Sequence, residues 1–163
     1  MSLYHLCIEH HQGIHTLVEQ GVIGSAFALI RPQFEAYVRG AWFAVCAKED
    51  DVMNFLRDKE PPKIGVLIAN LEEKNVDNAG SLRRMKVELW DTLCGFTPGG
   101  SVQVKARNTR DEIFQNYRLE HITGLIKASP ILSHSACTGM AAVLNDLGLA
   151  IRMRQAREAI YGA

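Results

Sequence analysis

Arg31, Glu35 and Arg39 are spaced by four residues, so on a helix they form one row of alternating charge. This charged row lies in residues 23–47, which are apolar around most of a helical circumference, a pattern typical of a helix buried on several sides. Because a buried charge is costly unless it is paired, the row favours an ion-pair network between helices or a dimer contact. The alternative is a polar pocket in which an arginine holds the phosphate or carboxylate of a small anionic ligand.

Two histidines are expected to point inward from their helices. His10 falls near the centre of the apolar face of residues 3–20, and His121 lies on the apolar side of a helix expected at 110–128. The simpler interpretation is a pair of neutral, hydrogen-bonded core histidines. The alternative is a general base or ligand anchor that completes the polar pocket with the charged row. Spacing alone does not establish whether these five side chains meet.

No other set of residues carries a specific catalytic signature. His11, His15 and Glu19 have metal-compatible spacing, but a single row on one helix is more often a solvated surface, so neither a metal nor a cofactor is predicted. The four cysteines form no close pair, which disfavours zinc sites, and we expect all four to be reduced core residues of a cytoplasmic protein. Nucleophile motifs are absent, so whether the chain is an enzyme stays open.

Composition limits the class of partner. The chain has 163 residues with 18 Lys and Arg against 18 Asp and Glu, so its formal net charge is zero. A nucleic-acid partner is therefore not expected, although basic clusters at residues 83–86 and 152–157 keep an RNA-acting defence or toxin-like protein as a further alternative. Near-zero net charge also favours self-association. No signal peptide and no membrane span are expected, because charges interrupt every long apolar stretch.

Helical periodicity dominates, and no segment alternates as a strand would. We expect one all-α domain over residues 1–163, a single-domain bundle of five to seven helices with a long C-terminal helix. The expected helices cover residues 3–20, 23–47, 48–59, 64–75, 81–94, 110–128 and 130–160. A capping box of Thr109 and Glu112 is expected to start the helix at 110, and residues 95–104 to form a loop. Pro130 is expected in the first turn of the last helix, which spans about 45 Å and projects or packs on a partner.

The segment from Ser25 to Trp42 resembles the signature helix of a family of uncharacterised bacterial all-helical proteins. The shared pattern is Arg-Pro-x-x-Glu-x-x-x-Arg-Gly-x-Trp, and the opening Tyr4-His-Leu-x-x-Glu-His and the stretch Gly99-Gly-x-x-Gln103 are also similar. The resemblance covers most of the chain and implies an all-helical fold. It implies no activity.

Together these features predict a soluble, cytoplasmic helical bundle of unknown biochemical role. We expect it to self-associate, most simply as a homodimer, and to act as a binding or structural module. The alternative is a ligand-binding or enzymatic bundle whose polar pocket contains Arg31, Glu35, Arg39, His10 and His121.

Overall fold

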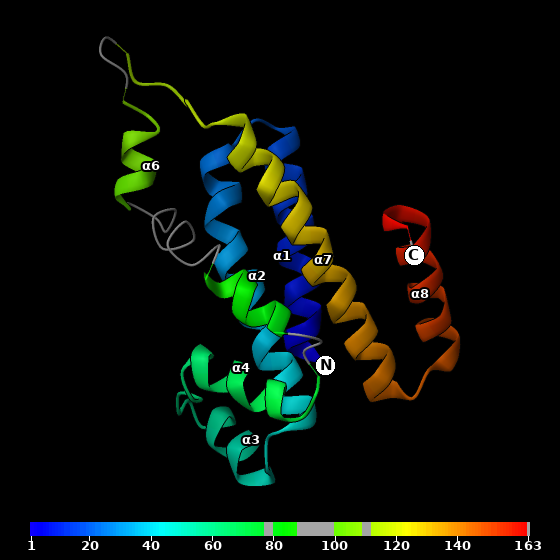
Figure 1. Ribbon diagram of the computed structural model, residues 1–163. Helices are drawn as coiled ribbons and strands as arrows, with labels where there is room; N and C mark the ends of the chain where they lie inside the picture. Colours follow the sequence, from blue (N-terminus) through cyan, green and yellow to red (C-terminus); the bar gives the residue numbers. More distant parts are fainter. Residues whose placement is uncertain (77–79, 88–99, 109–111, 163) are drawn as a thin grey trace.

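The computed structural model describes residues 1–76, 80–87, 100–108 and 112–162, and its regular elements are helices (Figure 1). The all-helical class expected from the sequence is confirmed. The helices are α1 (Ser2–Glu19), α2 (Ile23–Val45), α3 (Glu49–Leu56), α4 (Ile64–Glu73), α6 (Ser101–Lys105), α7 (Leu119–Leu144) and α8 (Leu147–Tyr161). Residues 81–87 form a further helical stretch.

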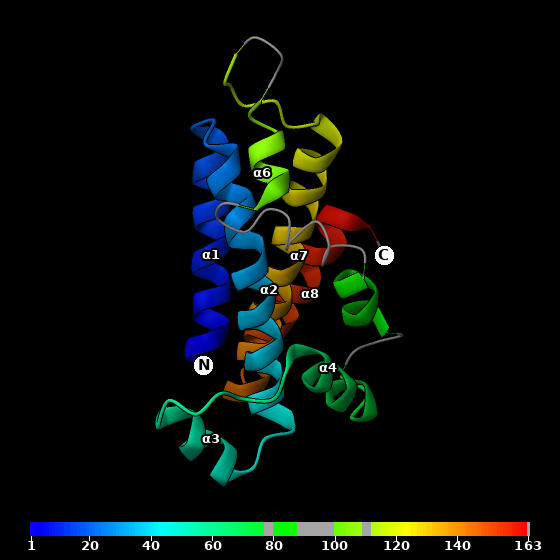
Figure 2. The ribbon, with the colours of Figure 1, turned by 90° about the vertical axis from the view of Figure 1, so that its left-hand side faces the viewer.

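Three long helices, α1, α2 and α7, lie side by side and form the centre of the molecule (Figures 1 and 2). A tight turn at Gly21, whose φ is +71°, reverses the chain between α1 and α2. α2 is buried along most of its length, as its wide apolar face predicts, and it continues through Pro32 without a break. Although α2 is long, no helix in the described part of the chain is apolar enough over a sufficient length to cross a membrane.

A polar junction joins the three long helices inside the core, and it consists of Gln33, Ser129, Cys7 and His11. The fully buried Gln33 donates from Nε2 to the backbone oxygen of Ser129 over 2.9 Å. His11 Nδ1 lies 2.9 Å from the hydroxyl of the same serine, and the Cys7 thiol donates weakly to the Leu132 oxygen over 3.7 Å. The junction therefore fixes how α1 and α2 are rotated against α7.

Tyr4 of α1 packs against glycines on both neighbouring helices. A Cβ added at Gly40 of α2 would lie 3.0 Å from Tyr4 Cδ1, and one at Gly139 of α7 would lie 2.6 Å from Tyr4 Cζ. Because real Cβ atoms do not approach so closely, the two glycines create the space that the tyrosine ring fills.

The expected helix at 110–128 begins later, at Leu119. Thr109 of the expected capping box lies outside the described residues, and residues 112–118 are not helical. Gln115 accounts for the difference, because its side chain accepts from Ile23 N at 3.1 Å and donates to Gly21 O at 3.0 Å. These bonds tie the segment to the turn between α1 and α2, where they satisfy backbone groups that a helix end leaves open.

In place of the single C-terminal helix expected from residue 130 to 160, the structure has the second half of α7 and the separate helix α8. Pro130 lies inside α7, and the chain breaks fifteen residues later at Asn145, which adopts the left-handed conformation with φ +52°. Asp146 then caps α8 by accepting from Leu149 N over 2.9 Å. α8 folds back along the C-terminal half of α7, as Figure 1 shows.

The remaining local expectations are met in part. The helix expected at 81–94 is described only to residue 87, and the expected loop at 95–104 overlaps α6, which begins at Ser101.

The described cysteines are free thiols, but only Cys7 is buried. Cys46 and Cys137 are half-buried, and Cys94 lies outside the described residues. Burial raises the pKa of the Cys7 thiol to about 12.

Two glycines of α7 provide a matched test of the Tyr4 packing. Gly139→Ala forces a methyl group against the tyrosine ring and is expected to lower the free energy of unfolding by about 1–3 kcal/mol. Gly124→Ala, with nothing within 4 Å of the added Cβ, is expected to raise it by about 0.5–1 kcal/mol through the helix preference of alanine. Urea unfolding measures both, and an equal effect of the two changes would contradict the proposed role of Gly139.

Candidate functional site

The charged row pairs within α2. Glu35 accepts from Arg31 Nε through Oε1 at 2.9 Å and from Arg39 Nη2 through Oε2 at 3.2 Å, so each carboxylate oxygen holds one arginine. All three side chains are half-buried, with 20% of Glu35 and about a third of each arginine exposed. Arg39 Nε is buried and has no hydrogen-bond partner within the described part of the chain. The carboxylate holds both arginines in place but offsets only one of their two charges.

These side chains line a groove of about 760 Å³ between α2, the end of α3, the segment 58–63 and the start of α4. We call it the basic groove. The cationic side chains that line it are Arg31, Arg39, Lys59, Lys63 and Lys86, and the carboxylates are Glu35, Asp58 and Glu60. Among the described residues that line the groove, five cations against three carboxylates leave two positive charges in excess.

Lys86 reaches the groove because an ion pair fastens its helix to α4. Arg83 donates from both Nε and Nη2 to the carboxylate of Glu72, and this contact lowers the pKa of Glu72. The Lys86 Nζ lies 3.1 Å from the position of a Cβ added at Gly65, in the first turn of α4. That turn has no side-chain cap, so the positive end of the α4 dipole lies near the ammonium group.

Aromatic contacts hold the walls of the groove together. Trp42 of α2 donates from Nε1 to Asn70 Oδ1 of α4 over 3.0 Å, and Phe43 packs on Phe55 of α3 with ring centroids 5.0 Å apart. Both residues follow Arg39 within one turn of α2. The helices that carry Arg31 and Arg39 and that flank the segment of Lys59 and Lys63 are therefore fixed to one another.

The two predicted pocket histidines lie elsewhere. His10 is half-buried on α1, where burial lowers its pKa, and His121 lies in the first turn of α7 with 41% of its side chain exposed and Nε2 3.9 Å from Glu120. Neither lines the basic groove. The structure thus brings together Arg31, Glu35 and Arg39, but it does not bring these histidines to them.

The structure adds residues that the sequence patterns did not single out. Lys59, Lys63 and Lys86 come from two separate segments, so their meeting depends on tertiary packing. The basic residues on both sides of Pro61-Pro62 were the available signal for the first two. His11, expected off the apolar face of α1, instead reaches the core through Ser129.

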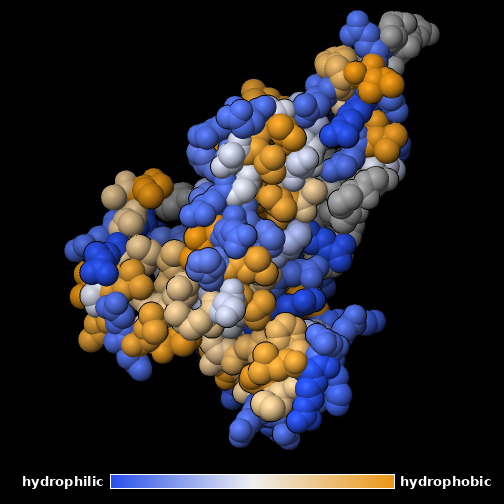
Figure 3. All heavy atoms as spheres, turned by 180° about the vertical axis from the view of Figure 1, so that it is seen from behind, coloured by the Kyte–Doolittle hydropathy of each residue, from blue (hydrophilic) through white to orange (hydrophobic). Residues whose placement is uncertain are grey.

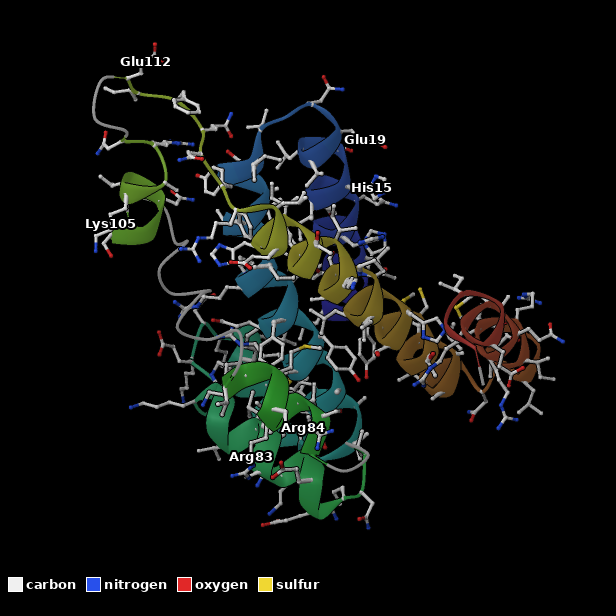
Figure 4. The ribbon with its side chains drawn as sticks, turned by 45° about the horizontal axis from the view of Figure 1, so that its top comes forward. His15, Glu19, Arg83, Arg84, Lys105 and Glu112 are labelled. Carbon is white, nitrogen blue, oxygen red and sulfur yellow. The ribbon has the colours of Figure 1, made fainter. Side chains whose placement is uncertain are left out.

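The row of His11, His15 and Glu19 forms no metal site. His11 contacts Ser129, and His15 Nδ1 lies 3.2 Å from Glu19 Oε1. Within the described residues, no group of three or more His, Cys, Asp and Glu side chains is arranged to hold a metal ion. Figure 4 shows His15 and Glu19 at one end of α1, well away from Arg83 and Arg84 on the helix beside the groove.

Comparison with known proteins places the chain in a family. Residues 4–162 match a family described as a family of unknown function, DUF6988. The chain belongs to the DUF6988 family. The expectation of membership in an uncharacterised family is confirmed, and no curated protein and no solved structure matches the chain. Membership in DUF6988 brings no activity with it, so a function must be argued from the site itself.

The chemistry open to this DUF6988 groove is recognition of negative charge. Guanidinium groups bind phosphate and carboxylate oxygens with paired hydrogen bonds, and ammonium groups add attraction. The described residues that line the groove include no histidine, cysteine or serine, so they offer no imidazole base, thiol or serine hydroxyl.

The polar junction of this DUF6988 chain predicts a pH dependence of stability. Burial, with a smaller contribution from His15, lowers the pKa of His11 below its ordinary 6.5. Below about pH 6.5 the unfolded chain therefore binds this proton more readily than the folded chain, so stability is full above that pH and falls as pH drops toward the folded pKa. His11→Gln should reduce this loss between pH 6.5 and 5, measured by urea unfolding.

The matched control is His5→Gln, at an exposed position on the same helix. It is expected to leave the acid-side loss of stability at the parental value. A His11→Gln variant with the same pH dependence as the parent would show that this histidine does not couple protonation to folding.

Proposed function

We propose that the protein binds a small anionic ligand carrying phosphate or carboxylate groups in the basic groove. The observation that carries this proposal is the convergence of five cationic side chains, from three segments of the chain, on one groove with three carboxylates. An anion there offsets the excess positive charge, and it gains charge-assisted hydrogen bonds in a partly dehydrated site.

Two details support an anion rather than a neutral ligand. Glu35 fixes both guanidinium groups by one edge each, so their geometry is set before a ligand arrives. Lys86 lies over the uncapped first turn of α4, which places a cation beside the positive end of a helix. An anion bound there is attracted both by the ammonium group and by the helix dipole.

Inorganic pyrophosphate provides the first probe. At ten times its dissociation constant, a ligand specific for the folded state adds about 1.4 kcal/mol of stability. For a chain of this size the melting temperature should then rise by roughly 3–6 °C. Arg39→Gln and Lys63→Gln should each weaken pyrophosphate binding about tenfold, because each removes one charged hydrogen-bond donor. Thermal unfolding and isothermal titration calorimetry measure the two effects.

The matched control is Lys127→Gln, an exposed lysine of α7 outside the groove. It should bind pyrophosphate like the parent. Chloride at equal ionic strength separates specific binding from screening. An equal stabilisation by chloride, or unchanged affinity in both groove variants, would contradict an anion site in the basic groove.

A second candidate function, self-association, is favoured by the surface of α8. This helix packs mainly on α7, and none of its described side chains is fully buried. Leu147 and Ile151 are 78% and 56% exposed. Figure 3 shows hydrophobic side chains spread over this face of the molecule. Arg152 and Arg154 flank Leu147 and Ile151.

The first turn of α3 presents the opposite charge in Glu49, Asp50 and Asp51, next to the exposed Val52 and Met53. We propose that the partner of α8 is a second copy of the chain, whose α3 supplies complementary charge.

Native mass spectrometry at low micromolar concentration tests this association. The parent is expected at twice the 18.1 kDa of one chain. Leu147→Glu combined with Ile151→Glu should shift the population to monomer, because both changes place charge in the apolar contact. Leu119→Glu, at a 77% exposed position at the other end of α7, should leave the dimer intact. A monomeric parent would contradict the proposal.

We also propose that the protein is cytoplasmic and bacterial, as expected from the sequence. The free thiols of Cys7, Cys46 and Cys137 support a reducing compartment.

A further inference from the structure

A second hollow lies between α2, α7 and residues 76 and 81–85, and Arg157 of α8 reaches it. It consists of two cavities of about 520 and 490 Å³ that share Tyr37, Val76, His134, Ser135 and Arg157 in their linings. We call the two together the α8 cleft. None of the shared residues lines the basic groove, so the cleft is a separate feature of the molecule.

Most of the cleft wall is aliphatic. One cavity is lined by Leu82, Met85, Ile131 and Leu132, and the other by alanine and valine side chains of α2 and α7. Hydroxyl groups of Tyr37 and Ser135 lie where the two cavities meet. An apolar cavity with a few convergent polar groups is the usual form of a small-molecule site.

Arg157 is the cation of this cleft. No carboxylate is among the described residues that line either cavity, and Arg157 forms no ion pair within the described part of the chain. Its neighbour Arg154 instead approaches Glu158, at 3.8 Å. A guanidinium group beside an aliphatic wall, with no carboxylate among the described residues of that wall, matches an amphipathic anion.

His134 holds α8 against α7 one turn before Arg157. Its Nε2 lies 2.7 Å from the backbone oxygen of Met153, and because a carbonyl oxygen only accepts, Nε2 is the donor. This bond joins α7 to α8 and holds Met153 toward α7. Arg157 follows Met153 by four residues, so both lie on the same face of α8. The arginine is therefore directed into the cleft by the packing of its own helix.

We propose that the α8 cleft binds an aliphatic carboxylate. The carboxylate group pairs with Arg157 and accepts a hydrogen bond from Ser135, and the alkyl chain lies against Leu82, Met85 and Ile131. The inference does not depend on the basic groove, because the two hollows share no residue.

Calorimetric titration of the full chain with decanoate at pH 8, below the concentration at which decanoate aggregates, tests the proposal. We expect saturable binding at one site. Acetate, which lacks the chain, and decanol, which lacks the charge, should each bind at least tenfold more weakly. Arg157→Gln should weaken decanoate binding at least tenfold, whereas Lys127→Gln, which removes an exposed cation of α7 outside the cleft, should bind decanoate like the parent.

Ile131→Ser tests the chain-binding wall. Ile131 is 43% exposed, so this variant is expected to fold, and circular dichroism checks that it does. It should lose decanoate affinity while retaining pyrophosphate affinity. Arg39→Gln should bind decanoate like the parent, which separates this site from the basic groove. Decanoate binding that does not saturate, that survives Arg157→Gln, or that pyrophosphate displaces would overturn the proposal.

Discussion

One buried hydrogen bond, from Gln33 on α2 to the backbone oxygen of Ser129 on α7, determines how the rest of the molecule is arranged. Both partners are almost completely buried, and each lies next to a proline inside its helix, Pro32 and Pro130. A buried amide without a partner costs several times what a satisfied one contributes, so α2 cannot rotate away from this contact cheaply. His11 adds a second bond to the same serine and brings α1 into the same arrangement.

The orientation of the charged row follows from that bond. At about 100° per residue, the centre of the Arg31, Glu35 and Arg39 row lies roughly 160° around α2 from Gln33. Pointing Gln33 into α7 therefore points the row away from the three-helix core and toward α3 and α4. Those elements cover it only in part, which leaves room for the basic groove. The groove is thus the consequence of a buried glutamine on the opposite face of the same helix.

Local chemistry explains which parts of this arrangement can be predicted from sequence. The pairing of Glu35 with both arginines depends only on helical spacing, and it lies within α2, whereas the sequence favoured a network between helices or a dimer contact. The rotation of α1 is not local: the apolar wheel favours His10, but the hydroxyl of Ser129, far along the chain, selects His11. The start of α7 depends likewise on Gln115 reaching the turn between α1 and α2.

The division between α7 and α8 was within reach of sequence reasoning. Asn tolerates the left-handed conformation and Asp is a strong N-cap, so Asn145-Asp146 is a local break signal that the apolar periodicity on both sides obscured. Pro130 was the weaker signal, because a long helix packed on both α1 and α2 tolerates one missing N–H. The lysines of the basic groove carry no such local signal, since only the folded chain brings residues 59, 63 and 86 together.

The position of α8 links the two surfaces that it helps to form. Leu147 and Ile151 lie on one face of the helix, whereas Met153 and Arg157 lie about 120° away and face α7. With no fully buried side chain and one side-chain bond to α7, this helix is among the most weakly held elements in the described structure. The proposed ligand of the α8 cleft would add contacts on one face, and the proposed second copy of the chain would add contacts on the other. Both would stabilise the docked position of α8, so thermodynamic linkage predicts that each strengthens the binding of the other.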